Sequence, residues 1–265
     1  MELLSIASGS SGNCYYIGNE ETHLLVDAGV SGKKIETALN EIDRKPSDLN
    51  GILVTHEHID HVKGLGVMAR KHGIPIYTTG GTISEIKKMS SVGTIDDSLF
   101  HEIEPDEPFF INDLSIDASA IWHDAADPVC YSISDGKSKF SIATDMGNFD
   151  DYVVNKLKNS DIMVIEANHD IRMLQAGPYP YYLKQRILGD RGHLSNELSG
   201  QLLCDILHDN LKHIMLGHLS RENNYAKLAY ETVKLEVTLA ENEYKGEDLD
   251  MFVASRDSVS EIVTV

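Results

Sequence analysis

The chain has 265 residues, 42% of them hydrophobic, and a formal net charge of −19. That length can bury one large core or two small ones, and the absence of any uninterrupted apolar run of about 18 residues argues against a membrane span. The acidity argues against a protein coated in a basic surface for nucleic acid, and the N-terminal segment lacks the basic and apolar regions of a signal peptide.

The predicted elements alternate between strands and helices. The sequence predicts buried strands at residues 23–29, 51–55, 74–79, 161–168 and 213–218. It predicts helices at residues 31–42, 61–73, about 195–208 and 223–238. Alternating apolar residues across 109–143 predict successive antiparallel strands, with a turn at 134–138. This order suggests an α/β fold class, with two sheets packed face to face and helices outside, in a single domain of residues 1–265.

Three cysteines, Cys14, Cys130 and Cys204, are scattered along the chain without CxxC spacing. An odd, scattered set is typical of a reduced protein rather than of a disulfide framework. We therefore expect a cytoplasmic protein.

The strongest motif is Thr-His-Glu-His-Ile-Asp-His at residues 55–61, between a predicted strand and a predicted helix. His56 and His58 are two residues apart, so on extended backbone both side chains project to the same side. Asp60 and His61 follow where the chain turns into the helix. Four such ligands can divide between two ions, and imidazole with carboxylate but no thiolate suits Zn, Mn or Fe. A chance surface cluster is the alternative, but it does not explain the strand before and the helix after.

Two ions need further ligands from elsewhere in the chain. His123, Asp145 and His218 each directly follow a predicted strand, where ligands at the end of a sheet are expected. A carboxylate at Asp145 has two oxygens and can bridge both ions. We interpret the histidines that lack such a setting as structural; they are His23, His72, His101, His208 and His213.

At this point the sequence resembles the metallo-β-lactamase superfamily. The residues that carry the resemblance are Asp27 in Leu-Leu-Val-Asp-Ala-Gly, the His-x-His-x-Asp-His motif at 56–61, His123, Asp145 and His218. They occur in the family's order and over most of the chain. The resemblance implies a four-layer αβ/βα sandwich with a dinuclear metal site at one edge.

The resemblance also implies which ligands hold which ion. The first ion would be held by His56, His58, His123 and Asp145. The second would be held by Asp60, His61, Asp145 and His218. Asp27 would then support the ligand loop, and the alternative is a plain turn aspartate.

Four further segments resemble the YycJ/WalJ group of phosphodiesterases within this superfamily. They lie at 8–13 (Ser-Gly-Ser-Ser-Gly-Asn), 166–170 (Glu-Ala-Asn-His-Asp), 177–197 and 217–224. That group is described as acting on nucleic acid, including 5′-to-3′ degradation of double-stranded DNA. The resemblance therefore implies a DNA exonuclease. The alternatives are an RNA nuclease, or a cyclic phosphodiesterase for small molecules like that of the alkylphosphonate pathway, which shares the N-terminal loop and two late histidines.

One segment of the chain suits an anionic polymer. Residues 172–193 carry four Lys or Arg and one acid, whereas residues 96–117 carry eight acids and no Lys or Arg. Lys184 and Arg186, beside three tyrosines between 179 and 182, combine positive charge with aromatic faces on which bases can stack. A packed aromatic helix start is the alternative.

Other candidate substrate contacts lie in loops. The loop with Ser10 and Asn13 lacks the Gly-Lys-Ser/Thr of a P-loop, yet it can present backbone N–H groups to an anion. A tight turn between strands explains that loop equally well. Asn168 and His169 either contact phosphate or cap a helix, and Arg221 follows the last predicted ligand.

The tetrapeptide Gly-His-Leu-Ser occurs at 192–195 and again at 217–220. Two divalent ions lower the pKa of a bridging water, and the resulting hydroxide, oriented by Asp60, can attack phosphorus in line. The leaving oxygen then needs a proton. His218 cannot supply it as a metal ligand, because its ring stays neutral, and that leaves His193. The alternative is that His193 merely precedes a helix N-cap.

Other function classes differ in what they require. A thioester or lactone hydrolase of this fold would share the metal ligands but would not need His193 or the basic, tyrosine-rich segment. Purely structural metals fit poorly, because structural zinc sites are closed and usually rich in thiolate. We therefore predict a hydrolase with two divalent ions, Zn or Mn with Fe as a further option, whose substrate partner is nucleic acid and which has no membrane partner.

Overall fold

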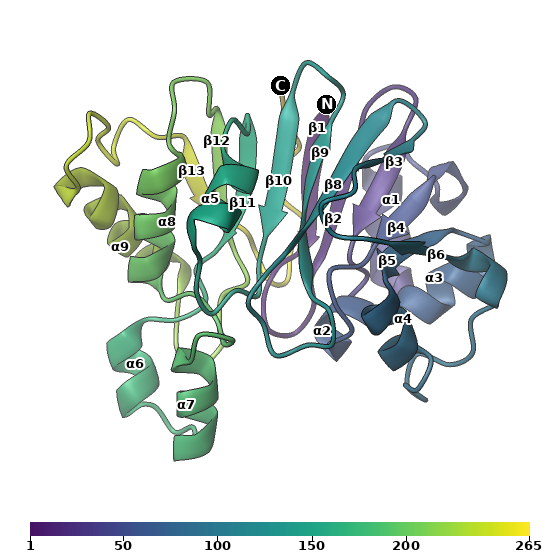
Figure 1. Cartoon of the computed structure of the whole chain (residues 1–265), viewed down its shortest axis with the longest axis horizontal. Coiled ribbons are helices and arrows are strands. Elements are labelled where there is room, and N and C mark those ends of the chain that lie inside the picture. Colours follow the sequence, from purple (N-terminus) through teal and green to yellow (C-terminus); the bar gives the residue numbers. More distant parts are fainter. The chain divides into compact units, whose positions relative to one another are not determined.

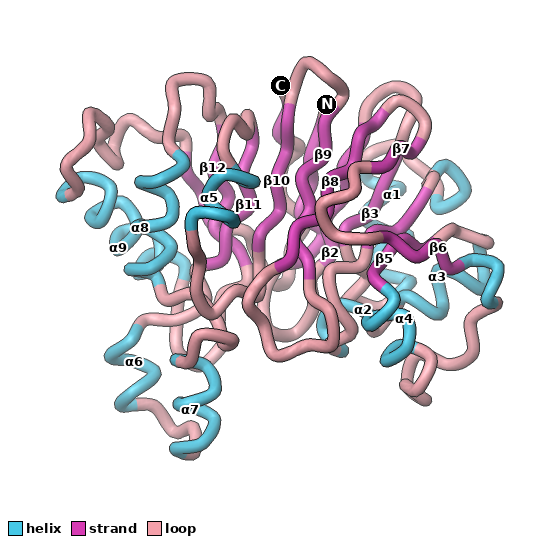
Figure 2. The backbone as a smooth tube through the Cα atoms, in the orientation of Figure 1, coloured by secondary structure: helices cyan, strands magenta, loops and turns pink.

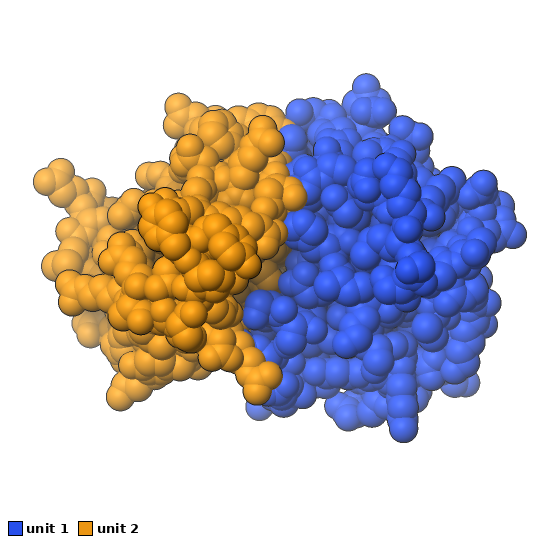
Figure 3. All heavy atoms as spheres, turned by 90° about the horizontal axis from the view of Figure 1, so that it is seen from below, with its two compact units in different colours: residues 1–120, 125–136, 255–264 blue, residues 121–124, 137–254, 265 orange.

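The computed structural model describes residues 1–265 and divides into two compact units, which Figure 3 colours separately. Unit 1 contains residues 1–120, 125–136 and 255–264. Unit 2 contains residues 121–124 and 137–254, together with Val265. Figures 1 and 2 show the helices and strands of each unit.

Unit 1 contains a seven-stranded mixed sheet in the order β14-β1-β2-β3-β4-β5-β6. The pairs from β14 to β3 are antiparallel, and those from β3 to β6 are parallel. The strands are β1 (Glu2–Ala7), β2 (Cys14–Gly18), β3 (His23–Val26), β4 (Gly51–Leu53), β5 (Ile76–Thr79), β6 (Phe100–Ile103) and β14 (Val263–Thr264). The predicted strands at 23–29, 51–55 and 74–79 are therefore confirmed.

Unit 1 also contains three antiparallel strands, β7 (Phe109–Ile111), β8 (Leu114–Ala120) and β9 (Val129–Ser134). Their antiparallel pairing confirms the prediction for the first part of residues 109–143. Apolar residues of β8 are buried at alternate positions, which is the period of two that the sequence shows.

The helices of unit 1 are α1 (Gly32–Glu41), α2 (Ile59–Val62), α3 (Leu65–His72) and α4 (Gly80–Ile86), with short 3-10 turns η1 (Pro46–Asp48) and η2 (Asp97–Leu99). The side chain of Ser31 caps α1, and Gly73, with a positive φ of 67°, closes α3. The single helix predicted at 61–73 is wrong, because the chain breaks at Gly64. The Gly64 N–H donates to the carbonyl of Ala28, and a Cβ at Gly64 would lie 2.1 Å from the carbonyl oxygen of Val30.

Unit 2 contains four parallel strands in the order β13-β12-β11-β10. They are β10 (Lys139–Ala143), β11 (Ile162–Glu166), β12 (His213–Gly217) and β13 (Met251–Val253). Strand β10 pairs in parallel with β11. The physical reason is the helix that follows β10, since such a crossover returns the chain in the same direction.

The helices of unit 2 are α5 (Asp151–Leu157), α6 (Ile171–Ala176), α7 (Tyr181–Leu188), α8 (Asn196–Ile206) and α9 (Ala226–Leu239). Helices α8 and α9 confirm the two predicted helices, and the Ser195 side chain caps α8 by accepting from the N–H of Leu198. Helices α6 and α7 were not predicted, and they extend beyond the carboxyl ends of the unit 2 strands (Figure 1). Among the helices of both units, none combines the length and the apolar character that crossing a bilayer requires.

Candidate metal centre

The four predicted ligands of unit 1 form one cluster, with His56 and His58 in the loop after β4 and Asp60 and His61 in the short helix α2. The ring centroid of His56 lies 4.6 Å from that of His58 and 4.1 Å from that of His61. The Asp60 carboxylate lies 3.7 Å from Nε2 of His61. Because His56 and His61 are fully buried, this cluster is held in a fixed arrangement rather than displayed on flexible side chains.

Asp27 orients this cluster from the end of β3. Its carboxylate accepts hydrogen bonds from the N–H of Thr55 at 2.9 Å, the hydroxyl of Thr55 at 2.9 Å and Nδ1 of His61 at 2.7 Å. The Thr55 hydroxyl also lies 3.0 Å from Nδ1 of His56. A ring held at Nδ1 directs Nε2 outward as an acceptor, which is the usual way that a carboxylate prepares a histidine for a metal ion. Asp27 is thus more than a plain turn residue.

The N-terminal loop at residues 8–13 packs beside the ligand loop. The Asn13 N–H donates to the carbonyl of Asp60 at 2.8 Å, and its side-chain nitrogen lies 3.1 Å from Nε2 of His61. The Asn13 side-chain oxygen accepts from the N–H of Gly9 at 2.9 Å. Ser10 is exposed. The loop therefore lies next to predicted metal ligands, and its contact with a substrate stays a prediction.

The predicted ligands of unit 2 lie around Asp145, at the end of β10. Its Oδ1 lies 3.8 Å from Nε2 of His123 and 3.3 Å from Nδ1 of His218. All three side chains are buried. Asp145 and His218, which follow β10 and β12, both have left-handed backbones, with φ of 62° and 54°. Such strain in residues other than glycine is concentrated at functional sites.

Glu166, the last residue of β11, was not predicted as a site residue. Its Oε1 accepts from Nδ1 of His193 at 2.8 Å and from Nδ1 of His218 at 2.7 Å. Its Oε2 accepts from the N–H groups of Met146 at 2.9 Å and Leu194 at 3.2 Å. One fully buried carboxylate therefore holds both Gly-His-Leu-Ser histidines, and its side chain forms a possible ligand group with Asp145, His193 and His218.

The environment of Glu166 keeps this carboxylate ionised. Burial would raise its pKa, but the charge of His193 and the hydrogen bonds from His193 and His218 outweigh burial and lower the pKa to about 2. The signals in the sequence were an acid at the end of an otherwise apolar strand and its place at the start of the segment 166–170, which resembles the YycJ/WalJ group.

His193 lies between two predicted ligands. Its ring centroid is 5.2 Å from that of His123 and 5.2 Å from that of His218. Its side chain is 15% exposed, whereas those of His123 and His218 are almost completely buried. His193 is thus the histidine of this group that is most open to a reactant.

Two of the predicted substrate contacts beside this group are buried. The Asn168 side chain donates to the carbonyl of His218 at 2.9 Å, so Asn168 supports the loop that carries this ligand. His169 is buried, and burial lowers its pKa to about 4, so the ring is neutral near pH 7. Their contact with a substrate stays a prediction.

The remaining predicted contacts are more exposed. The Lys184 ammonium donates to the carbonyl of Gln175 at 2.7 Å, and the Arg186 guanidinium binds the carboxylate of Asp124. Arg221 is exposed. The tyrosines at 181 and 182 are 77% and 74% exposed, which contradicts a packed aromatic helix start.

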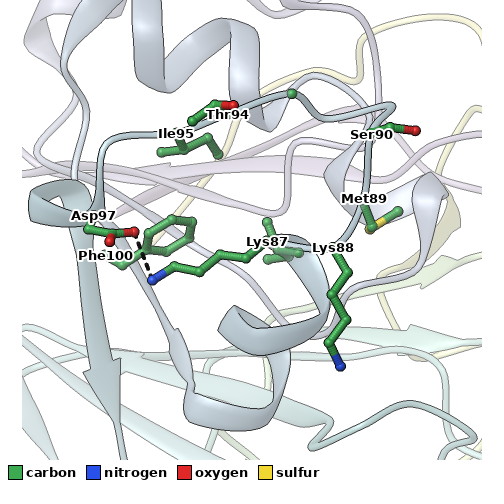
Figure 4. Close-up of a pocket in the computed structure, with 10 residues that line it drawn as sticks. Lys87, Lys88, Met89, Ser90, Thr94, Ile95, Asp97 and Phe100 are labelled. Atoms are coloured by element: carbon green, nitrogen blue, oxygen red, sulfur yellow. Dashed lines mark ion pairs between the residues drawn. The ribbon is translucent and has the colours of Figure 1, made fainter.

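A separate cavity in unit 1 has a volume of about 520 Å³ (Figure 4). Lys87, which lines it, forms an ion pair with Asp97 at 2.8 Å and lies 5.3 Å from the centroid of the Phe100 ring. None of the predicted site residues lines this cavity. We therefore assign it no part in the chemistry.

Comparisons with known proteins bear on the family of this chain. The family model described as "Beta-lactamase superfamily domain" matches residues 22–211. The chain is 40% identical over 260 residues to a protein of Streptococcus pneumoniae named exodeoxyribonuclease WalJ, with 98% of this chain and 96% of that protein covered. It is 39% identical over 228 residues to exodeoxyribonuclease YycJ of Bacillus anthracis, with 86% of each covered.

Solved structures share the fold at low sequence identity. The metallo-β-lactamase fold protein YhfI of Bacillus subtilis matches with a TM-score of 0.70 and 16% identity, over 98% of this chain and 99% of that one. Zn-bound PqqB of Methylobacterium extorquens matches with a TM-score of 0.70 and 14% identity, over 98% and 100%. The two sheets with their helices thus have the fold of these structures, and the His/Asp cluster supports divalent metal ions. The chain belongs to the metallo-β-lactamase superfamily and, within it, to the group of the WalJ and YycJ proteins.

Proposed function

We propose that this chain is a metal-dependent exodeoxyribonuclease. The observation that carries the proposal is the pair His193–Glu166 beside the predicted ligands of unit 2, in a chain 40% identical to an exodeoxyribonuclease over nearly its whole length. We propose 5′-to-3′ digestion of double-stranded DNA, as the resemblance to the group implies. Because the three scattered cysteines suit a reducing compartment, we place the activity in the cytoplasm.

The donor set fits two divalent metal ions. Because Nδ1 of His56, His61 and His218 is held by neighbouring oxygens, these rings would bind an ion through Nε2, and Asp145 would add a carboxylate. Imidazole and carboxylate donors suit Zn or Mn, with Fe as a further option. When bound, two such ions supply Lewis-acid polarisation of the phosphodiester and lower the pKa of water towards neutrality.

We propose the division of ligands that the superfamily resemblance implies. His56, His58, His123 and Asp145 would hold one ion. Asp60, His61, Asp145 and His218 would hold the other. Asp60 in addition accepts a hydrogen bond from the attacking water and so orients it towards phosphorus.

His193 supplies the proton that the departing oxygen needs. With Nδ1–H donating to Glu166, the protonated ring presents Nε2–H to the leaving group. The Glu166 carboxylate fixes the orientation of the His193 ring, much as the aspartate of a Ser-His-Asp triad holds its histidine. His218 makes the same bond to Glu166 but is a metal ligand in this proposal, so it does not transfer a proton.

The DNA strand is held by residues outside the reacting centre. Lys184 and the exposed tyrosines at 181 and 182 lie on α7, which extends beyond the strand ends of unit 2. Stacking on an exposed aromatic ring contributes about 1–3 kcal/mol per base, without regard to base identity. We propose Ser10, Asn13, His169 and Arg221 as further contacts. Asn168 and Arg186 were predicted as contacts too; the first donates to the carbonyl of His218 and the second binds Asp124, and their contact with a substrate stays a prediction.

A panel of substrates tests this function. The purified protein with Mn or Zn is offered 5′-labelled and 3′-labelled duplex DNA, single-stranded DNA and RNA, together with a lactone and a thioester. We expect nucleotides to be released from duplex DNA, beginning at the 5′ end. Preferential cleavage of RNA would favour the RNA-nuclease alternative, and turnover of only the lactone or thioester would contradict phosphodiester chemistry.

A further inference from the structure

A closed ring of contacts in unit 2 joins three pairs of neighbouring residues, at 123–124, 186–187 and 192–193. The first link is an ion pair between the side chains of Asp124 and Arg186. The Arg186 guanidinium donates from Nη2 to Oδ1 at 3.0 Å and from Nε to Oδ2. This bidentate arrangement fixes direction as well as distance.

The other two links involve the backbone around the proposed acid. The His193 N–H donates to the carbonyl of Ile187 at 3.0 Å. Nδ1 of His123 lies 3.1 Å from the carbonyl oxygen of Gly192 and donates to it. The carboxyl end of α7 is therefore bonded to His193 and, through Gly192, to His123.

The ring is tight at Gly192. A Cβ at this position would lie 2.1 Å from the carbonyl oxygen of Ile187 and 2.4 Å from that of Arg186. A Cβ at Gly147, in the loop after Asp145, would lie 2.3 Å from the Gly192 nitrogen. Backbone packing this close leaves residues 192–193 little room to move independently of α7, so a displacement of α7 moves these residues as well.

We infer that Arg186 is a positioning residue, which acts through Asp124 to hold α7 so that His193 stays in place relative to His123. The inference rests on the proposed role of His193. It assigns Arg186 a different role from the phosphate contact that its charge alone suggests. The pair is partly solvated, with side chains 49% and 30% exposed, and such pairs contribute little to folding stability. Its loss should therefore change geometry rather than unfold the protein.

A double-mutant cycle tests this assignment. The variants are Asp124→Asn, Arg186→Gln and the combination of both, with kcat and KM measured on duplex DNA and on bis(p-nitrophenyl) phosphate. Misplacing a catalytic group by about 1 Å can cost up to about 100-fold. We expect each single variant to lose about 10- to 100-fold in kcat on DNA, much less on the activated diester, and to keep its metal content. The double variant should lose no more kcat on DNA than the more impaired of the two single variants, because both changes break the same link.

A phosphate contact predicts the opposite pattern. Arg186→Gln would then raise KM for DNA and flatten its salt dependence, whereas Asp124→Asn would release the guanidinium and lower KM. Either that pattern or additive losses in kcat would overturn the inference.

The conservative variant Arg186→Lys gives an independent measurement. Lysine keeps the charge but cannot form the bidentate bond, so we expect it to lose kcat as the glutamine variant does. Wild-type kcat in the lysine variant would overturn the inference. An inactive wild-type enzyme would instead contradict the proposed function, and so the two failures are distinguishable.

Discussion

The ligand-bearing regions of the two units are built in different ways. In unit 1 four predicted ligands lie within six consecutive residues, at 56–61. In unit 2 they come from separate segments, with Asp145 after β10 and His218 after β12. A buried carboxylate nevertheless orients histidines in both, Asp27 in the first and Glu166 in the second. In both units a carboxylate accepts a hydrogen bond from Nδ1 of a predicted ligand histidine. Glu166 differs because it also accepts from His193, which we propose as the general acid.

Removing Asp145 should have the largest effect. If one carboxylate serves two ions, Asp145→Ala loses metal occupancy and all activity, because the remaining histidines cannot hold both charges close together. Elemental analysis and DNA digestion check this, with the exposed Asp151→Ala as the matched control. Full dinuclear occupancy in the Asp145 variant would rule out the bridging assignment.

The two Gly-His-Leu-Ser histidines should differ when each is replaced. His218→Ala should lose metal and activity on every substrate. His193→Ala should keep its metal and lose about 10²–10⁴-fold on DNA, since general acid catalysis typically contributes that much. The loss should be much smaller on bis(p-nitrophenyl) phosphate, because nitrophenolate departs without a proton. Loss of metal from the His193 variant would make it a ligand, and equal losses on both substrates would remove its role as an acid.

Replacing each of the two orienting carboxylates, Asp27 and Glu166, should separate effects on metal affinity from effects on proton transfer. Asp27→Asn should weaken metal binding by about 10- to 100-fold, which is typical for partners of metal-bound histidines. Glu166→Gln should weaken metal binding similarly and, in addition, show the dependence on leaving group expected of His193→Ala. Metal titration and the ratio of the two substrate rates check this. A Glu166 variant whose rate ratio matches wild type would contradict the coupling of Glu166 to His193.

The smallest effect is expected on the outer surface of α7. Lys184→Ala should weaken binding of duplex DNA and reduce the slope of log affinity against log salt by about one, because one phosphate contact is lost. Hydrolysis of a small diester should not change. The matched control is Lys158→Ala, on another segment of unit 2. Equal losses on polymer and small diester would exclude a strand-binding role for Lys184.

Much of this arrangement could be predicted because it is local in the sequence. The ligand loop is a contiguous motif, and Ser31, Gly73 and Ser195 mark helix ends by their own chemistry. The helix predicted at 61–73 is interrupted because Gly64 packs against the backbone near Ala28, a contact that a helical pattern does not encode.

The features that sequence patterns did not indicate depend on distant contacts. In the sequence, Glu166 is the last residue of an apolar strand. The histidines that it bonds, His193 and His218, lie 27 and 52 residues further along the chain. Helices α6 and α7 are short and are separated by Gly177, Pro178 and Pro180, which are typical of a loop. Pro180 is in fact the N-cap of α7.

The most direct measurement of the proposed activity compares linear with covalently closed circular duplex DNA of the same sequence. An exonuclease needs a strand end, so the enzyme with Mn or Zn should degrade the linear form and leave the closed circle intact. A chelator should stop the reaction, and added metal should restore it. Nicking of the closed circle, degradation that persists with chelator, or no digestion of either form with either metal would contradict a metal-dependent exodeoxyribonuclease.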